Sequence, residues 1–356
     1  IYPRITFDFP LPEEVAPPWI GNRRIIESRG ENIGQPISWD RIDLSPNYAL
    51  LGRLLERVQG YICVEIVDAS SDKVLVAERK PLAFMAPNEW YYEGNDSNSF
   101  HEALAAFVLP SDPFVTEILI EARKILERDT GDSSTQGYQA EQYSSLPLHE
   151  RSRASQIAKA IYEAMCSVGY SYSNPQGRLE EGGQRVRTPS QIKAEGCGTC
   201  LDTTVLMAAC FAQAGLEPVL FLIEGHAFAG YLTGEIIRGA NGNPLPDQSG
   251  EIAIGSRTVQ HWKREAGPVL RKPENYQLIQ KLLQEKHIQA VETTTTTTGS
   301  RSTFSEACLQ QNGFDTNDDS LLESIVFVSN AWSKGITPPV SLANVPLQGN
   351  FNPNPQ

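Results

Sequence analysis

The chain has 356 residues, which is long enough for two domains that each bury a core of their own. Its formal net charge is −13, so we expect neither a broad basic surface nor direct nucleic-acid binding. No stretch approaches about 18 uninterrupted apolar residues, and the start IYPRITFDFP lacks the pattern of a signal peptide, so no membrane segment is expected. Because the sequence opens without Met, we expect a segment of a longer chain.

The first part of the chain, residues 1–100, predicts a β-sandwich-like domain. Short apolar or alternating runs, separated by Pro, Gly, Asn and Asp as strands in a sandwich are, occur at 5–9, 23–28, 61–68, 73–80 and 81–87. The residues SSDK at 70–73 predict a hairpin turn. Apolar spacing over 47–59 favours a helix, although a strand and turn are also open there. No catalytic constellation occurs here, which indicates a scaffold or interaction module.

Residues 101–147 predict a helical connector. A short helix is expected to stop at Pro110, and a longer one over 112–129 has Asp112 as its cap and Pro113 in its first turn. The remainder of this stretch, rich in Ser, Gln and Gly, predicts a polar linker.

Residues 148–337 predict an α+β core. It begins with an amphipathic helix over 149–169 that ends at Gly169. The strands after His226 follow one another without long helical crossovers, which indicates an antiparallel sheet. The Pro- and Asn-rich residues 338–356 predict a flexible tail.

A cysteine and a histidine in this core predict a nucleophilic site. The run CLDTTVLMAACFAQAG has helical periodicity and places Cys200 in the first turn, where the helix dipole and unpaired N–H groups favour a thiolate. His226 follows 26 residues later, at the start of the second of two strands hinged at Gly225. Glu292 closes the strand-like run KHIQAVETT and is the candidate to orient the imidazole.

The loop before Cys200 supplies further candidates. Gln184 is expected to donate to an oxyanion, and Arg187 to bind substrate, because ordered loops before a nucleophile often carry binding groups. A solvated loop is the alternative for Arg187 and for Arg185. Asp202 lies close to Cys200, but two residues into the helix it is expected to cap backbone amides or to pair with a loop arginine.

The spacing C-x-x-C between Cys197 and Cys200 leaves two other kinds of site open. A redox motif predicts a disulfide between them and no role for His226, whereas a zinc site needs a second close pair that the sequence lacks. We therefore expect no metal and no cofactor. The six cysteines lie mostly in apolar patterns, which suits a reducing compartment, and a cytoplasmic location is expected.

The combination of motifs resembles a known family. The patterns GQ-x-VR-x-P, G-x-CLD, GHAF-x-G and VE-x-T occur in this order, at Gly183, Gln184, Val186, Arg187 and Pro189, at Gly198, Cys200, Leu201 and Asp202, at Gly225, His226, Ala227 and Phe228, and at Val291, Glu292 and Thr293. They resemble the transglutaminase-like branch of papain-like cysteine enzymes. More narrowly, the chain from about residue 60 to 337 is similar to uncharacterised bacterial proteins, some of which lie N-terminal to superfamily 1 helicases. Most transglutaminase-like enzymes carry Asp where this chain has Glu292.

The resemblance implies a nucleophile helix packed on an antiparallel sheet, with Cys200, His226 and Glu292 as a catalytic triad. The leading hypothesis is a cysteine protease that cleaves a protein or peptide through a thioester, with a role in bacterial defence and a helicase or nuclease as partner or fused domain. Two alternatives stay open. The same triad serves a transglutaminase or amidase, and a catalytically idle core would serve as an interaction module.

Overall fold

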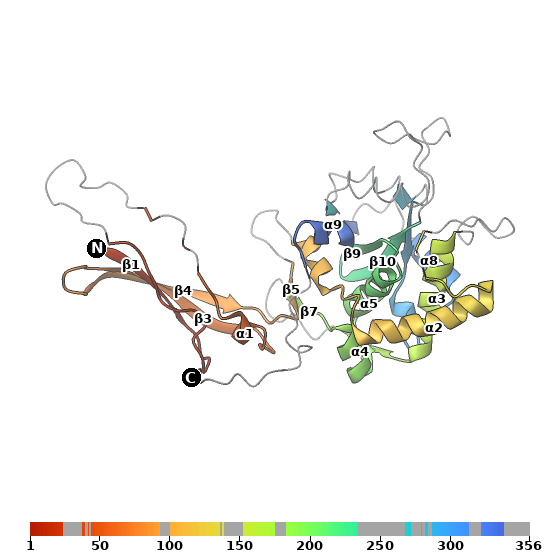
Figure 1. Cartoon of the computed structure of the whole chain (residues 1–356), viewed down its shortest axis with the longest axis horizontal. Helices are drawn as coiled ribbons and strands as arrows, with labels where there is room; N and C mark the ends of the chain where they lie inside the picture. Colours follow the sequence, from red (N-terminus) through yellow and green to blue (C-terminus); the bar gives the residue numbers. More distant parts are fainter. Residues whose placement is uncertain are drawn as a thin grey trace, which may run out of the picture. The chain divides into compact units, whose positions relative to one another are not determined.

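In the computed structural model, the described residues divide into two compact units, one within Ile1–Glu89 and the other within Trp90–Pro339 (Figure 1). The structure describes residues 1–23, 38–39, 42, 44–92, 100–135, 137–138, 152–174, 183–233, 268–271, 279, 282–283, 287–312 and 322–337, with the backbone alone for 309–312. The boundary between the units falls ahead of the expected one at residue 100. The expected tail, 338–356, lies outside the described residues.

The described part of the first unit is a single antiparallel sheet with a short helix. The strands lie in the order β2-β1-β3-β4, so these residues form one sheet and not the two packed sheets of the expected sandwich. The elements are β1 (Tyr2–Asp8), β2 (Trp19–Ile20), α1 (Tyr48–Leu51), β3 (Val58–Val67) and β4 (Val74–Phe84). The expected strand at 23–28 lies almost wholly outside the described residues.

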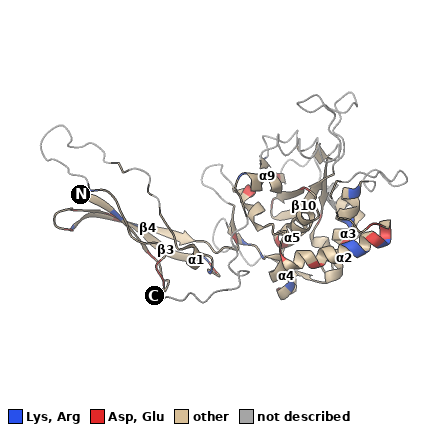
Figure 2. Cartoon of the chain, in the orientation of Figure 1, with Lys and Arg blue, Asp and Glu red and all other residues tan. Residues whose placement is uncertain are grey.

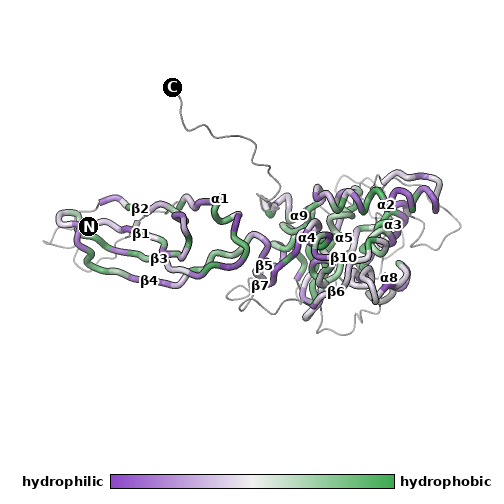
Figure 3. The backbone as a smooth tube through the Cα atoms, turned by 90° about the horizontal axis from the view of Figure 1, so that it is seen from below, coloured by the Kyte–Doolittle hydropathy of each residue, from purple (hydrophilic) through white to green (hydrophobic). Residues whose placement is uncertain are grey.

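The β3–β4 hairpin shows which local predictions hold in this unit. The turn at 70–73 is confirmed, since Asp68 N–H donates to the Lys73 carbonyl at 2.9 Å and Asp72 takes a positive φ of 54°. Hydrophobic ends of β4 flank a hydrophilic run at 78–80 (Figure 3). The helix expected over 47–59 is wrong beyond its first turn, because β3 already begins at Val58, where its pairing with β4 starts.

The second unit is built on a five-stranded antiparallel sheet with apolar clusters on both faces. The strand order is β11-β13-β9-β10-β12, and α5 packs against β9 and β10 (Figure 1). Side chains alternate along β9, so that Leu220 and Leu222 join the cluster around α5, whereas Val219 and Phe221 join the opposite one. The strands are β9 (Pro218–Ile223), β10 (His226–Leu232), β11 (Val269–Arg271), β12 (Ile288–Val291) and β13 (Leu322–Phe327). The α+β class and the antiparallel sheet are therefore confirmed.

The helices expected to form a connector belong to the core of this second unit. Phe114, Ile118 and Leu126 of α2 share one buried cluster with α3 and α5, so 101–147 is no separate domain. Asp112 caps α2 with Pro113 in its first turn, and Gly169 ends α3 with a φ of 86°, both as predicted. The helices are η1 (His101–Phe107), α2 (Pro113–Thr130), α3 (Arg153–Val168), α4 (Pro189–Glu195), α5 (Cys200–Gln213), η3 (Thr294–Thr296), α8 (Phe304–Asn312) and α9 (Val328–Ser333).

Charges of both signs are interspersed on α2 and α3 (Figure 2). Between the two helices, Arg128 lies 3.4 Å from Glu163 and Lys159 lies 3.8 Å from Asp129. Such exposed pairs contribute little to stability. Among the described residues, no helix combines the length and apolar character needed to cross a membrane. The remaining strands are β5 (Glu89–Tyr91), β6 (Ser171–Tyr172), β7 (Gly183–Arg185) and β8 (Cys197–Gly198).

Candidate active site

Cys200 is the first residue of α5, as the sequence predicts. Thr199 is the N-cap, and its hydroxyl accepts from the Asp202 N–H at 3.2 Å while Oδ2 of Asp202 accepts from the Thr199 N–H at 2.9 Å. This reciprocal capping box fixes where the helix begins. The Cys200 N–H is one of the groups for which a helix has no internal acceptor, and Cys200 is only 6% exposed.

Asp202 anchors the preceding loop to the same helix turn. Its Oδ1 accepts from the Arg187 N–H at 2.7 Å, and its Oδ2 accepts from the Arg187 guanidinium at 3.0 Å. The predicted pairing with a loop arginine is thus confirmed. The same guanidinium donates to Glu195 at 2.7 Å, and its side chain is 12% exposed. Arg187 therefore braces the loop, and its contacts give no support to the predicted role in substrate binding.

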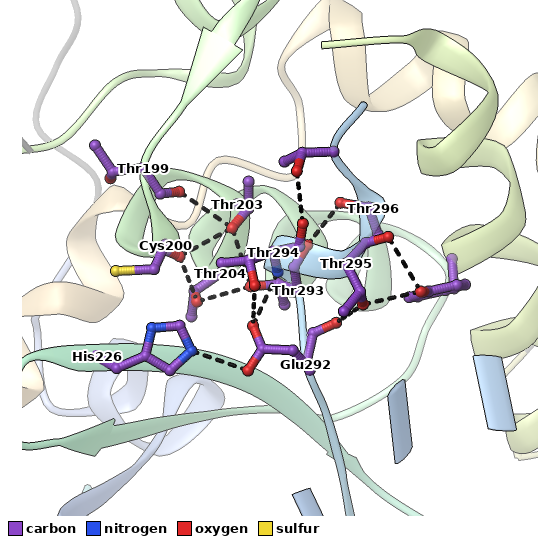
Figure 4. Close-up of polar contacts among 12 residues, drawn as sticks. Thr199, Cys200, Thr203, Thr204, His226, Glu292, Thr293, Thr294, Thr295 and Thr296 are labelled. Carbon is purple, nitrogen blue, oxygen red and sulfur yellow. Dashed lines mark hydrogen bonds and ion pairs between the residues drawn. The ribbon is translucent and has the colours of Figure 1, made fainter. Parts of the chain in front are cut away.

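His226 and Glu292 are joined by a hydrogen bond of 2.9 Å between Nε2 and Oε2. The register of the sheet explains this. Ala229 pairs with Val291 in antiparallel β10 and β12, so the start of β10 at His226 lies near Glu292, the residue that follows the end of β12. Gly225, with a φ of 71°, forms the turn that starts β10 at His226. Figure 4 shows the other ring nitrogen of His226 on the side of Cys200.

The electrostatic balance at His226 favours the imidazolium. Burial alone lowers the pKa of His226, but its hydrogen bonds to Cys200 and Glu292 outweigh burial and raise that pKa to about 10. For Glu292, burial favours the neutral acid, yet bonds from His226 and Thr294 leave the pKa below its ordinary value. Thr294 supplies two of these, from its N–H at 3.0 Å and its hydroxyl at 2.7 Å. An imidazolium at His226 paired with the Glu292 carboxylate is the result.

Buried hydroxyl groups tie the nucleophile helix to the segment that carries Glu292. Thr293 Oγ1 lies 3.0 Å from Thr203 Oγ1 and 3.3 Å from Thr204 Oγ1. Both of these helix hydroxyls donate to the Cys200 carbonyl, at 3.0 and 2.7 Å (Figure 4). All three threonine side chains are fully buried. Thr293 belongs to the motif VE-x-T, but the sequence gives no sign of this link, because its partners are about 90 residues away along the chain.

The strand-like run KHIQAVETT is a strand only as far as Val291, and the threonine run after Glu292 is a turn. Residues 294–296 form η3, and Thr295 Oγ1 donates to the Glu292 carbonyl at 2.7 Å. Two buried tyrosines hold this turn from outside: Tyr162 contacts Thr295 at 2.9 Å, and Tyr170 contacts Thr296 at 2.5 Å. Consecutive hydroxyl groups can supply the hydrogen bonds that a tight turn needs within an apolar core, which explains why the run consists of threonine.

Two side-chain donors near the start of the site are buried and have no partner among the described residues. One is Nε2 of Gln184 in β7, the amide nitrogen that the sequence analysis assigned to an oxyanion. The other is Oγ of Ser173, whose N–H donates to the Gly198 carbonyl at 2.9 Å, two residues before Cys200. Buried polar groups are nearly always paired, so each of these donors has the capacity for a further hydrogen bond. Ser173 carries no motif and was missed.

Cys197 and Cys200 are both free thiols in the structure. Cys197 lies in β8, whose parallel partner is β6, with Ser171 opposite Cys197 and Tyr172 opposite Gly198. The described part of the chain contains no group of three or more His, Cys, Asp or Glu side chains arranged to hold a metal ion.

One cavity of the second unit lies away from the candidate site. It has a volume of about 950 Å³ between α2, α3 and residues 301–308, and neither Cys200, His226 nor Glu292 lines it. Two thiols at its wall, Cys166 and Cys308, have their pKa values raised by burial, which disfavours a reactive thiolate. Hydrogen bonding and burial, and not cavity volume, therefore distinguish the candidate site.

The chain matches no family model, no curated protein and no solved structure. The arrangement of Cys200, His226 and Glu292 within the second unit is therefore the basis for a proposal of function. Cys200 begins α5, His226 begins β10 and Glu292 directly follows β12. Hydrogen bonds from His226 and Thr294 orient the Glu292 carboxylate.

Proposed function

We propose that the chain is a cysteine hydrolase, with a protein or peptide amide as its substrate and Cys200, His226 and Glu292 as its catalytic triad. One observation carries the proposal: His226 bonds to Glu292 through one ring nitrogen, and its other ring nitrogen lies on the side of Cys200. This is the arrangement of nucleophile, base and orienting acid on which covalent acyl transfer depends. The alternative of an idle interaction module predicts a distant or blocked pair, and this arrangement argues against it.

The reaction follows from the roles of these groups. The Cys200 thiolate attacks the amide carbonyl, and the resulting oxyanion collapses as the C–N bond breaks. His226, protonated on the nitrogen that faces Cys200, gives that proton to the departing amine, and the acyl group remains on sulfur as a thioester. A water then attacks the thioester, passes a proton to His226 and releases the carboxylic acid and the thiolate. Glu292 holds the imidazole in one orientation throughout.

Two donors are suited to the oxyanion. The Cys200 N–H at the start of α5 is one, since it has no acceptor within the helix. The Gln184 amide is the other, because its Nε2 is buried and has no partner among the described residues. A nucleophile helix packed on an antiparallel sheet, with base and acid on adjacent strands, also supports a papain-like core of the transglutaminase-like kind. A bacterial defence role and a helicase or nuclease partner stay predictions.

Iodoacetamide alkylation at pH 6 tests the proposal. Ordinary thiols react slowly there, whereas a thiolate held by an imidazolium reacts fast. Cys200 is expected to react at least about tenfold faster than Cys63, a partly exposed thiol outside the site, as followed by peptide mass spectrometry. The variant His226→Ala is expected to bring Cys200 down to the rate of Cys63. Equal rates for both thiols in the wild-type chain would contradict the proposal.

Turnover is the second arm of this test. A mixture of peptides, with and without a fluorescent primary amine, separates hydrolysis from transfer to an amine by mass. Cys200→Ala is expected to abolish both products. Cys210→Ala is the matched control, because Cys210 lies in the same helix, is fully buried and has a pKa raised by burial, so it should leave turnover intact. Full activity of Cys200→Ala would remove Cys200 from the mechanism.

A further inference from the structure

We propose that the cavity between α2, α3 and the start of α8 binds a medium-chain fatty acid, with its carboxylate on Arg301 and its apolar chain along α3. This site lies outside the triad, and the inference does not depend on the proposed function. The cavity has a volume of about 950 Å³, which is within the range of pockets that hold small molecules. Helix α3 contacts both α2 and α8, so the walls belong to the second unit (Figure 1).

The cavity follows α3 for most of the length of this helix. Its wall includes Ser155, near the N-terminal end of α3, and Cys166, near the C-terminal end. At 1.5 Å per residue, these two positions are about 16 Å apart along the helix. A wall of this length matches an elongated ligand better than a compact one.

The middle of the wall is mainly apolar. Leu126 of α2 and Ala160 of α3 line it, and the rings of Tyr162 and Phe304 lie 5.6 Å apart on the side of α8. The Tyr162 hydroxyl donates to the Ser302 carbonyl at 3.0 Å, so this tyrosine offers its ring to the cavity. An apolar chain is therefore the chemistry that this surface favours, since its burial removes apolar area from water.

The charges at the cavity leave one cation without an acidic partner. Asp129 lies 2.7 Å from Arg128 and 3.8 Å from Lys159, and Glu163 lies 3.4 and 3.7 Å from the same two cations. Both acids of the wall are thus neutralised. Arg301 also lines the cavity, and it forms no ion pair within the described part of the chain. Its guanidinium is suited to hold a carboxylate through two parallel hydrogen bonds.

The position of Arg301 sets the direction in which the ligand lies. Its Nη2 is 4.0 Å from the point that a Cβ on Gly169 would occupy, directly after the end of α3. Arg301 is exposed, whereas Leu126 and Ala160 are only 1% and 2% exposed. The carboxylate therefore meets Arg301 near solvent at the C-terminal end of α3, and the chain extends inward toward Ser155.

Isothermal titration calorimetry with decanoate tests this proposal. Decanoate is expected to bind saturably and about tenfold tighter than octanoate, because its chain buries two more methylene groups. Arg301→Gln is expected to weaken decanoate binding about tenfold and to leave the binding of decan-1-ol, which has no charge, unchanged. Arg123→Gln is the matched control, since Arg123 is an exposed arginine of α2 outside the cavity. It should bind both ligands as the wild-type chain does.

Alkylation by iodoacetamide at alkaline pH locates the chain of the ligand. Decanoate is expected to suppress labelling of Cys166, a partly exposed thiol of the wall, and to leave labelling of Cys63 in the first unit unchanged. Labelling of Cys166 at the same rate with and without decanoate would place the ligand elsewhere and overturn the proposal.

The remaining outcomes separate this site from the triad. Absence of saturable binding, or equal decanoate affinity in Arg301→Gln and the wild-type chain, would overturn the fatty-acid site and leave the triad standing. Cys200→Ala is expected to bind decanoate as the wild-type chain does. Failure of the proposed hydrolase would therefore leave the calorimetric result unchanged.

Discussion

The first turn of α5 and its later turns are buried to the same degree but differ in chemistry. Asp202, Thr203 and Thr204 are 0% exposed, as are the apolar residues at 205–210 that follow them. The apolar turns gain stability by leaving water. The polar turn gains nothing in that way, and a buried polar group without a partner costs about 1–3 kcal/mol. A polar end on an otherwise apolar helix therefore indicates a requirement other than packing.

The two cysteines of α5 illustrate the same difference. Cys210 lies among apolar side chains, and burial raises its pKa, so it serves as a small core residue. Cys200 lies ten residues earlier, at the helix N-terminus and on the side of a ring nitrogen of His226. The same side chain thus has opposite surroundings at the two ends of one helix. Three predictions test whether the polar end is catalytic, structural or both.

The largest effect is expected when the orienting acid loses its charge. Glu292→Gln removes the carboxylate that stabilises the imidazolium, and turnover should fall by about 10³-fold. Activity needs a proton on His226 and should decline in the wild type as pH rises through about 10, the raised pKa of His226. Without the carboxylate that pKa falls, so the alkaline limb should move toward neutrality. Profiles of kcat/KM against pH measure both changes.

Glu306→Gln is the matched control, because it makes the same chemical change at a residue outside the site. Glu306 is exposed and caps α8 through Thr303. It should leave both the rate and the alkaline limb in place. An alkaline limb at the same pH in Glu292→Gln as in the wild type would show that Glu292 does not govern the protonation of His226.

The next effect concerns stability. Asp202→Ala leaves the buried guanidinium of Arg187 with Glu195 alone and frees two backbone N–H groups, so unfolding should become easier by about 3 kcal/mol. Urea unfolding followed by circular dichroism measures this. Glu195→Ala removes the more exposed partner of the same arginine and should cost less than about 1 kcal/mol. Equal losses in the two variants would mean that Asp202 does not hold the loop to the helix.

Local signals predicted most of the elements around this site. The cap at Asp112, the glycine that ends α3, the start of α5 at Cys200 and the turn at Gly225 depend on neighbouring residues, and all occur as expected. The pairing of Asp202 with a loop arginine also followed from its place in the first helical turn. Such features are encoded within a few residues of one another, so sequence alone is sufficient for them.

Contacts between distant segments were beyond the same reasoning. Tyr172 lies opposite Gly198, two residues before Cys200, through a parallel pairing of two-residue strands, which has no periodicity to recognise. The helix of α2 was assigned to a connector, because an amphipathic pattern shows that one face is buried but not against what. The sandwich expectation for the first unit failed in the described residues for a similar reason, since strand runs do not specify how many sheets they form.

The smallest effect is expected at Thr293, whose hydroxyl links the first turn of α5 to the segment that carries Glu292. Thr293→Val keeps the shape but removes the hydroxyl that joins Thr203 and Thr204, whereas Thr293→Ser keeps the hydroxyl and removes a methyl group. Each change should cost about 1 kcal/mol of stability, so unfolding will not distinguish them. Activity will, because only Val disconnects the first turn of α5 from the segment that holds Glu292. We expect a roughly tenfold lower kcat for Val, a loss equivalent to one hydrogen bond, and a nearly unchanged kcat for Ser. Equal kcat values for both variants would mean that these hydroxyls serve only to fill the core.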